Sequence, residues 1–336
     1  MTNKNNTEVP TTLKRQLEIE DVVKLVFISL FAGCGGSSKG YHLTDEFKEL
    51  LALEWDKNAR EVFARNFPDV PIEGWDISEV SGQQILDRTG LRPGELDVFD
   101  ASPPCQDFST SNTKRDPNTA RNTLYFKTLD LIEVVQPKVF VIENVEGMSQ
   151  GKMRGVWNEI VDKLQTMNYY SEFKVVKAEE HDVPQLRRRL IIVGVRRDIH
   201  SQFNITHLFP KPTSCAKEMT VTSVLPNIMG YSPGQFQDRF HFANESPMCT
   251  ITKTASAWVY DHDGIRRKPT LKELKVLSSF PDDFSFENCS INQAWARIGN
   301  AVPPNITKAI GLHIRNHILT NDVLEWCNNS SLTIAA

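Results

Sequence analysis

Short apolar runs alternate with amphipathic stretches through the first two thirds of the chain. The runs have the composition of strands buried on both faces of a sheet, and they cover residues 25–31, 51–54, 96–101, 138–143, 173–178 and 190–195. Apolar residues with helical spacing lie between them, at residues 57–67, 123–135 and 156–167. This alternation predicts an α/β fold with a doubly wound, Rossmann-like parallel sheet.

The alternation ends near Arg197. Residues 198–262 are polar, contain five prolines and have too few apolar runs to extend the sheet, so we expect a small irregular inserted domain there. Helical patterning returns at residues 270–280 and again after Pro304. Residues 1–23 are rich in Asn, Thr, Lys and Glu and are predicted to form a tail.

Charge and cysteine content narrow the protein class. Lys and Arg total 38 against 42 Asp and Glu, a net charge of −4, so binding to nucleic acid would need a local basic patch. The six cysteines form no C-x-x-C pair and no zinc-type spacing, which predicts no metal site and a reduced, cytoplasmic compartment. The chain shows no apolar leader and no run of about 18 apolar residues, so we expect no signal peptide and no contact with a membrane.

A glycine-rich turn follows the first predicted strand, with the sequence Phe31-Ala32-Gly33-Cys34-Gly35-Gly36. Glycines allow the backbone to turn tightly and to approach a ligand where a Cβ atom would clash. The same glycines also suit a tight strand–helix turn that binds nothing. On this motif alone, the two interpretations have equal weight.

Acidic residues follow the next predicted strands. Glu54 and Trp55 come about 20 positions after the glycines, where a carboxylate suits a ribose hydroxyl pair and an indole could stack on adenine. Asp76 and Ile77 form a second acidic and apolar pair before a helix. A surface carboxylate and a helix cap are the alternatives.

A cysteine follows two prolines directly after the strand at residues 96–101, in the sequence Ser102-Pro103-Pro104-Cys105-Gln106. Most lone cysteines are small buried hydrophobes. The two prolines restrict the backbone before Cys105, and the surrounding loop is polar, so this thiol is a candidate nucleophile. The following loop, residues 106–123, carries several basic residues and is interpreted as a mobile lid.

Two further motifs carry charge at predicted strand ends. Glu143 leaves an apolar strand in the sequence Glu143-Asn144-Val145 and could act as an acid, although a helix cap is the simpler interpretation. In Gln185-Leu186-Arg187-Arg188-Arg189, strand alternation places Arg187 and Arg189 on one face, suited to an anionic or carbonyl-bearing ligand. A solvated charge cluster on an edge strand is the alternative.

The order of these motifs along the chain is more informative than any one of them. In carrying these motifs in this order, the chain closely resembles the DNA cytosine-5 methyltransferases of the bacterial restriction-modification type. The resemblance runs from about Lys24 to His317, outside the variable middle. Later parts of it are Pro269 to Glu273, Phe280 to Phe284, and the sequence Ile298-Gly299-Asn300-Ala301-Val302-Pro303-Pro304. It implies a catalytic domain at residues 24–197, a target-recognition domain at 198–290 with its variable part at 198–262, and a segment at 291–336 that returns to the catalytic domain.

The resemblance implies a site for S-adenosylmethionine, which becomes S-adenosylhomocysteine. Glu54 would bind the ribose, Trp55 would flank the adenine, and Asn300 would touch the methionine part. The full implied set is Phe31, Ala32, Gly33, Cys34, Gly35, Gly36, Glu54, Trp55, Asp76, Ile77, Ser102, Pro104, Leu124, Asn300, Ala301 and Val302.

The resemblance also implies the catalytic residues and the partner. Cys105 would attack C6 of a cytosine flipped out of double-stranded DNA, Glu143 would hold and protonate N3, and Arg187 and Arg189 would anchor the base and its loop. The next residues are either implied to contact DNA or are candidates for reading base edges. They are Gln106, Ser109, Lys114, Gln235, Gln237, Arg239, Asn244, Thr252 and Lys253. The assignment of Thr252 as a DNA contact rests on the stretch Thr250-Ile251-Thr252, which resembles a stretch of the family. The resemblance also implies a cognate restriction endonuclease as a functional partner.

Three other functions remain open. A tRNA cytosine-5 methyltransferase would share Pro103-Pro104-Cys105-Gln106, but the Cys-Phe-Thr signature of that group is absent from the variable region. A non-catalytic DNA-binding homologue would lose the cysteine, the glutamate or the glycines, all of which are present. A nicotinamide dehydrogenase would share the glycines and the acidic residue but would have no use for Cys105.

Overall fold

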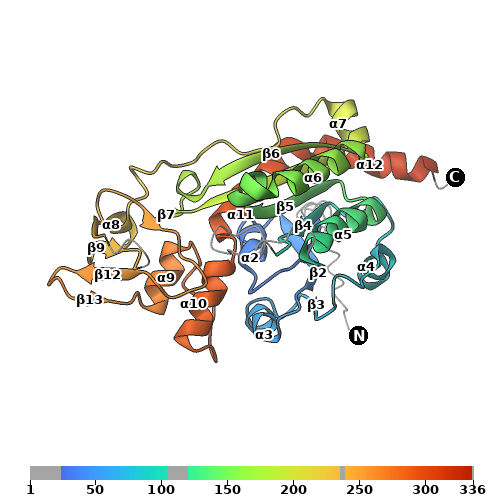
Figure 1. Ribbon diagram of the computed structural model, residues 1–336. Coiled ribbons are helices and arrows are strands. Elements are labelled where there is room, and N and C mark those ends of the chain that lie inside the picture. Colours follow the sequence, from blue (N-terminus) through green and yellow to red (C-terminus); the bar gives the residue numbers. More distant parts are fainter. Residues whose placement is uncertain (1–23, 105–119, 235–238, 335–336) are drawn as a thin grey trace, which may run out of the picture.

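The computed structural model describes residues 24–104, 120–234 and 239–334, and a seven-stranded sheet forms its centre. The strand order is β3-β2-β1-β4-β5-β8-β6, with β4 in the middle. Figure 1 labels β3 and β6 at the two ends of this order. The strands are β1 (Leu25–Leu30), β2 (Phe47–Leu53), β3 (Ile72–Glu73), β4 (Val98–Ala101), β5 (Val139–Val145), β6 (Tyr169–Lys177) and β8 (Arg188–Arg196). This sheet confirms the predicted α/β class.

The prediction of a fully parallel sheet is wrong at one strand. β8 runs antiparallel to both β5 and β6, so that Val145 pairs with Arg189. The chain turns straight from β6 through β7 (Gln185–Leu186) into β8 without a crossover helix, and such a short connection can only join antiparallel strands. As a result, β8 begins at the edge where the parallel strands end.

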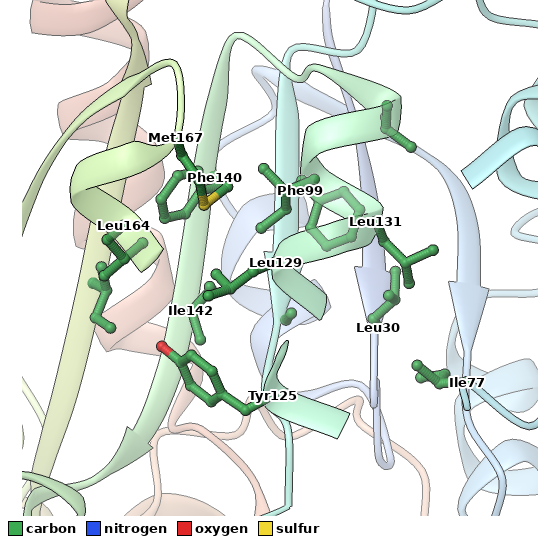
Figure 2. Packing of buried hydrophobic residues seen from close by; sticks show 14 of the residues in the cluster. Leu30, Ile77, Phe99, Tyr125, Leu129, Leu131, Phe140, Ile142, Leu164 and Met167 are labelled. Atoms are coloured by element: carbon green, nitrogen blue, oxygen red, sulfur yellow. The ribbon is translucent and has the colours of Figure 1, made fainter. Parts of the chain in front are cut away.

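Helices cover both faces of the sheet. One face packs against α4 (Gly82–Thr89), α5 (Ala120–Val135) and α6 (Arg154–Thr166), and Figure 2 shows Tyr125 and Leu129 of α5 against Phe99 and Ile142 of the sheet. The other face packs against α2 (Gly36–His42), α7 (Arg197–Phe203), α11 (Pro304–His313) and α12 (Asn321–Ile334). Single helical turns complete the layers at Glu146–Ser149, Gly151–Met153, Ala178–Glu180 and Ile314–Ile318. Burial on both faces explains why these strands read as continuous apolar runs.

The segment expected to be irregular contains a sheet of its own. Its strands, in the order β10-β9-β12-β13, are β9 (Ile228–Ser232), β10 (His241–Phe242), β12 (Trp258–Asp261) and β13 (Arg266–Arg267). Helices α8 (Val221–Val224), α9 (Leu271–Leu277) and α10 (Ile291–Asn300) pack with it, at the left of Figure 1, and β11 (Met248–Cys249) pairs with β7. These strands are too short to give a clear alternating pattern in the sequence.

The boundaries between the parts are set by packing. Ile199, Ile205 and Leu208 lie beyond residue 197 but are buried with α11 and α12 against the large sheet. Conversely, Cys34 of the turn after β1, Phe63 of α3 (Lys57–Asn66) and Phe67 just after it are buried with Phe284 of the small domain and Trp295 of α10. The two parts therefore share a core beside the glycine-rich turn. In the described ranges, none of the helices combines the length and the apolar character needed to cross a membrane.

Candidate active site

The glycine-rich turn forms the first wall of the site. Phe31, Gly33 and Gly35 have φ angles of 57°, 57° and 92°, so the chain reverses sharply after β1 through left-handed conformations. Phe31 adopts such a conformation although it has a side chain, which costs conformational energy and is typical of functional turns. A Cβ atom at Gly33 would face open space, so the turn presents bare backbone at this point.

Glu54 fastens the loop after β2 to the glycine-rich turn. Its Oε2 atom accepts a hydrogen bond from the backbone N–H of Gly33 at 2.8 Å, and Oε1 accepts one from the N–H of Asp56 at 2.7 Å. The intervening Trp55 is 68% exposed. An indole so exposed, beside an oriented carboxylate and bare backbone, is available for a planar ligand.

The C-terminal segment closes against the same turn. A Cβ atom at Gly36 would lie 2.4 Å from the Val302 carbonyl oxygen and 2.8 Å from the Ala301 Cβ, so only glycine permits this approach. Asn300 is exposed at the end of α10. Ala301 and Val302 therefore lie directly against the glycine-rich turn, and Asn300 is the residue before them.

The other predicted cofactor residues differ in their burial and in their contacts. Asp76 is exposed and accepts hydrogen bonds from the N–H and hydroxyl of Ser78, beside a hollow of about 210 Å³. Ile77 is buried in the core, and Leu124 packs partly buried against that core. The N–H of Ser102 donates to the Leu30 carbonyl oxygen at 3.2 Å, while Pro104 is half-buried.

Glu143 and Arg189 form an ion pair at the sheet edge. Arg189 Nε lies 2.8 Å from Glu143 Oε1, and both side chains are mostly buried. The next residue, Asn144, donates from Nδ2 to the Pro103 carbonyl oxygen at 3.4 Å. β5 thus fixes both the carboxylate and the proline loop that leads to Cys105.

Arg187 does not share the position of Arg189. Its side chain is 2% exposed, and its terminal nitrogens donate to the backbone carbonyl oxygens of Ile251, Gly299 and Ala301 at 2.7 to 3.0 Å. The expectation that both arginines face one ligand is therefore wrong for this conformation. Arg187 instead joins the catalytic sheet, the small domain and the C-terminal segment.

The predicted phosphate-contact residue, Thr252, is exposed and its backbone is held tightly. The Trp295 indole N–H donates to the Thr252 carbonyl oxygen at 3.0 Å, and a Cβ at Gly299 would lie 2.3 Å from the same carbonyl group. Arg239, Asn244 and Lys253 are exposed as well. The predicted residues Cys105, Gln106, Ser109, Lys114, Gln235 and Gln237 lie outside the described residues.

Sequence reasoning missed several residues that shape the site. Arg297 Nη2 lies 2.8 Å from Asp56 Oδ1, and Arg297 Nε donates to Asn58 at 3.0 Å, so α10 holds the loop that carries Trp55. Asp100 is buried on β4 and accepts hydrogen bonds from Ser37 and Tyr41. No local pattern signals these contacts, because each joins segments that are distant in the sequence.

Two of the cysteines in the described part of the chain are protected from reaction. Burial raises the pKa of Cys34 to about 12 and that of Cys249 to about 11, so both thiols stay protonated at neutral pH. The described residues also hold no group of three or more His, Cys, Asp or Glu side chains suited to a metal ion.

With this geometry in view, comparison with known proteins assigns the family. The model of the C-5 cytosine-specific DNA methylases matches residues 25–246 and 239–316. The chain belongs to this family. Its activity is therefore that of a DNA cytosine-5 methyltransferase, as the sequence motifs predicted.

The methylase resembles type II enzymes along most of its length. It is 28% identical to the type II methyltransferase M1.HphI of Haemophilus parahaemolyticus, over 86% of each chain. It is 25% identical to M.NgoPII of Neisseria gonorrhoeae, over 86% of this chain and 94% of the relative. A DNMT2 structure from Spodoptera frugiperda has the same fold, with a TM-score of 0.65 at 18% identity, covering 86% of this chain and all of the other.

Proposed function

We propose that this methylase flips a cytosine out of double-stranded DNA and transfers a methyl group from S-adenosylmethionine to its C5 atom. The observation that carries the proposal is the Glu143–Arg189 ion pair, which lies at the sheet edge beside the loop that leads to Cys105. A protonated Glu143 carboxyl group would donate to N3 of a cytosine ring, and the Arg189 guanidinium would donate to its carbonyl oxygen. The tests below separate this proposal from a tRNA substrate and from a role limited to DNA binding.

The glycine-rich turn and its surroundings fit S-adenosylmethionine. The open backbone at Gly33 and the exposed indole of Trp55 suit the cofactor. Glu54 would bind the ribose, and residues 300–302 would hold the methionine part. The bound cofactor would supply an electrophilic methyl group on a sulfonium. The chain's own residues must then make C5 nucleophilic and hold the ring.

Cys105 activates the ring in the proposed mechanism. Its thiolate adds to C6, and the C5–C6 electron pair becomes that of an enamine, which makes C5 nucleophilic. After C5 has accepted the methyl group, a base removes the C5 proton. Elimination then restores the C5–C6 double bond and releases the thiolate, while N3 returns its proton to Glu143 and the base passes the C5 proton to solvent. The enzyme is therefore unchanged at the end of the cycle.

Glu143 and Arg189 stabilise the charge that develops on the ring. Glu143 holds and protonates N3, which disperses negative charge as the thiolate adds. Arg189 binds the exocyclic carbonyl and keeps Glu143 in place through the 2.8 Å contact. Arg187 acts by positioning, because its guanidinium holds the backbone next to Thr252 and next to Val302.

DNA would lie between the two parts of the molecule. Thr252 would contact the phosphate of the flipped nucleotide, and Arg239 and Lys253 would face the duplex from the small domain. The family resemblance adds Gln106, Ser109 and Lys114 as contacts to the DNA backbone. Extruding the base costs about a few kcal/mol, which these contacts must offset. Despite the net charge of −4, DNA affinity should therefore fall as salt concentration rises.

The similarity to type II enzymes supports a role in restriction-modification, with a cognate endonuclease cutting the same unmethylated sequence. The direct test is a bisulfite map of DNA and of tRNA from cells that express the protein, with a Glu143→Gln variant as control. We expect 5-methylcytosine in one DNA sequence context with the wild type and much less with the variant. Methylation of tRNA alone, or of neither nucleic acid, would exclude the proposed function.

A further inference from the structure

Asp100 is a buried carboxylate that the proposed mechanism does not use. It lies on β4 and is 5% exposed. Oδ2 accepts a hydrogen bond from the Ser37 hydroxyl at 2.7 Å, and Oδ1 accepts one from the Tyr41 hydroxyl at 3.3 Å. Both donors are neutral and belong to α2, the helix that begins at the glycine-rich turn.

The charged groups near Asp100 are also acidic. Glu49 on β2 and Glu143 on β5 both disfavour its ionised form. Glu49 itself faces His42 of α2, at 3.2 Å, and Glu143 faces Arg189 of β8. Burial, together with the two carboxylates, raises the pKa of Asp100 to about 7. Its charge therefore changes within the range where such an enzyme works.

The position of Asp100 connects it to the cofactor residues on two sides. Its hydrogen-bond donor Ser37 directly follows Gly36, the residue that packs against Ala301 and Val302. Along β4, Asp100 comes two residues before Ser102 and five before Cys105. Asp100 is thus linked through Ser37 to the glycine-rich turn, and through the end of β4 to the segment that leads to Cys105.

We propose that Asp100, held by Ser37 and Tyr41 beneath the glycine-rich turn, makes the pocket prefer the positively charged S-adenosylmethionine over the neutral product S-adenosylhomocysteine. This inference rests on the cofactor assigned in the proposed function. The two ligands share adenosine, carboxylate and ammonium groups and differ by a methyl group and the charge on sulfur. A fixed negative charge in a poorly solvated place distinguishes them by that charge.

Selective binding of the cation has a consequence for turnover. Methyl transfer removes the positive charge from the bound molecule, so the attraction to Asp100 weakens when the reaction is complete. The product then leaves more readily, and fresh cofactor replaces it. Because the preference depends on ionised Asp100, it should increase as pH rises through about 7.

The test measures binding rather than turnover. Dissociation constants for S-adenosylmethionine and S-adenosylhomocysteine are measured by calorimetry from about pH 6 to about pH 8.5, for the wild type and for Asp100→Asn. The ratio of the two constants removes effects that the ligands share. In the wild type we expect the preference for S-adenosylmethionine to grow by about 10-fold across this range, on the scale of a charge pair in a partly buried site.

In Asp100→Asn we expect a ratio that does not change with pH, because the amide keeps the size of the side chain but carries no charge. Sinefungin, which has an amine in place of the methylsulfonium, should follow S-adenosylmethionine in both proteins. Thermal denaturation of each variant verifies that the fold is retained.

Ser37→Ala is the matched control. It keeps the carboxylate but removes a hydroxyl donor that favours the ionised form, so the pH at which the preference develops should shift upwards. This result would also keep the test valid if Asp100→Asn did not fold.

The outcomes separate this inference from the one on which it rests. If Asp100→Asn and Ser37→Ala keep the wild-type ratio at every pH, Asp100 has only a structural role and the inference is overturned. If the wild type binds neither ligand, the cofactor assignment fails, and this inference fails with it.

Discussion

Arg189 Nε lies 2.8 Å from Glu143 Oε1, across the antiparallel pair of β8 and β5. This contact exists because β8 runs opposite to its neighbours. A parallel β8 would begin at the other edge of the sheet, far from the end of β5. The reversed strand thus delivers a guanidinium to the carboxylate, and the pair is aligned before any base arrives.

Glu143→Gln should lower the rate of methyl transfer by about 10²- to 10⁴-fold, the range for loss of a positioned acid–base group. The amide is almost the same shape as the carboxyl group but cannot donate and accept a proton. Single-turnover rates with preformed enzyme–DNA complexes give the comparison. A decrease below about 10-fold would show that Glu143 does not act on the ring.

Arg189→Lys should also lose activity, although it keeps the charge. Lysine cannot reproduce the planar fork that holds a carboxylate and a carbonyl together. Arg188→Lys is the matched control, since Arg188 is the exposed neighbour and we expect it to keep full activity. Equal activity in both variants would contradict the role given to Arg189.

Cys105→Ser should abolish methyl transfer and leave DNA binding within about two-fold of the wild type. A hydroxyl group is a far weaker nucleophile than a thiolate at neutral pH. Incorporation of labelled methyl groups and gel-shift titration measure the two properties. Cys215→Ser, at an exposed free cysteine, is the control and should behave as the wild type. Residual turnover by Cys105→Ser would remove the proposed mechanism.

Gly299→Ala should destabilise the protein by about 1–3 kcal/mol, because the new methyl group would overlap the Thr252 carbonyl group at 2.3 Å. Gly155→Ala on α6 is the control, since nothing lies within 4 Å of its Cβ position and alanine favours a helix. Urea denaturation should show a lower free energy of unfolding than the wild type for Gly299→Ala and a higher one for Gly155→Ala. A neutral Gly299→Ala would mean that the contact between α10 and the Thr252 segment is loose.

Arg297→Ala should raise the KM for S-adenosylmethionine by about 10-fold with a smaller change in kcat. The substitution removes the contacts with Asp56 and Asn58 and releases the loop that carries Trp55. Lys163→Ala breaks a surface ion pair between α6 and α5 and should leave both constants unchanged. If Arg297→Ala and Lys163→Ala have the same KM and kcat, Arg297 does not position the loop that carries Trp55.

Asp100 should make stability depend on pH. Its folded pKa of about 7 lies above the ordinary value of 3.8, so the folded protein binds this proton more strongly than the unfolded chain. The stabilisation is complete below about pH 4 and is lost as pH rises through 7. Relative to the wild type, Asp100→Asn should therefore gain stability as pH rises from about 4 to about 7, with no further change above pH 7. Chemical denaturation measures the free energy of unfolding of both proteins at each pH. A difference between them that does not change with pH would contradict the raised pKa.

The sequence is most informative about features that a single segment of the chain determines by itself. The buried strands appear as apolar runs because both faces of the sheet are covered, and the turn at Gly33 and Gly35 is visible because left-handed backbone favours glycine. Glu54 and Glu143 were predicted as site residues because Glu54 follows β2 and Glu143 lies near the end of β5. The ends of parallel strands meet at one edge, so their proximity follows from the fold class.

The sequence is least informative where the site depends on contacts between distant segments. Strand alternation could not show that Arg187 is enclosed by carbonyl groups from residues 251, 299 and 301. The direction of β8 depends on a short connection that has no strong turn signal. The small sheet of β9, β10, β12 and β13 was missed because strands of two to five residues give no clear period.

The central claim is that the Cys105 sulfur bonds transiently to C6 of a target cytosine, and a trapping experiment tests it directly. Duplex DNA carrying 5-fluorocytosine at the mapped site is incubated with the enzyme and S-adenosylmethionine, because fluorine at C5 cannot leave as a proton does. We expect a covalent protein–DNA complex that resists denaturation, with peptide mapping placing the bond on Cys105. An enzyme that methylates ordinary DNA but forms no such complex, or forms it at another residue, would contradict the mechanism.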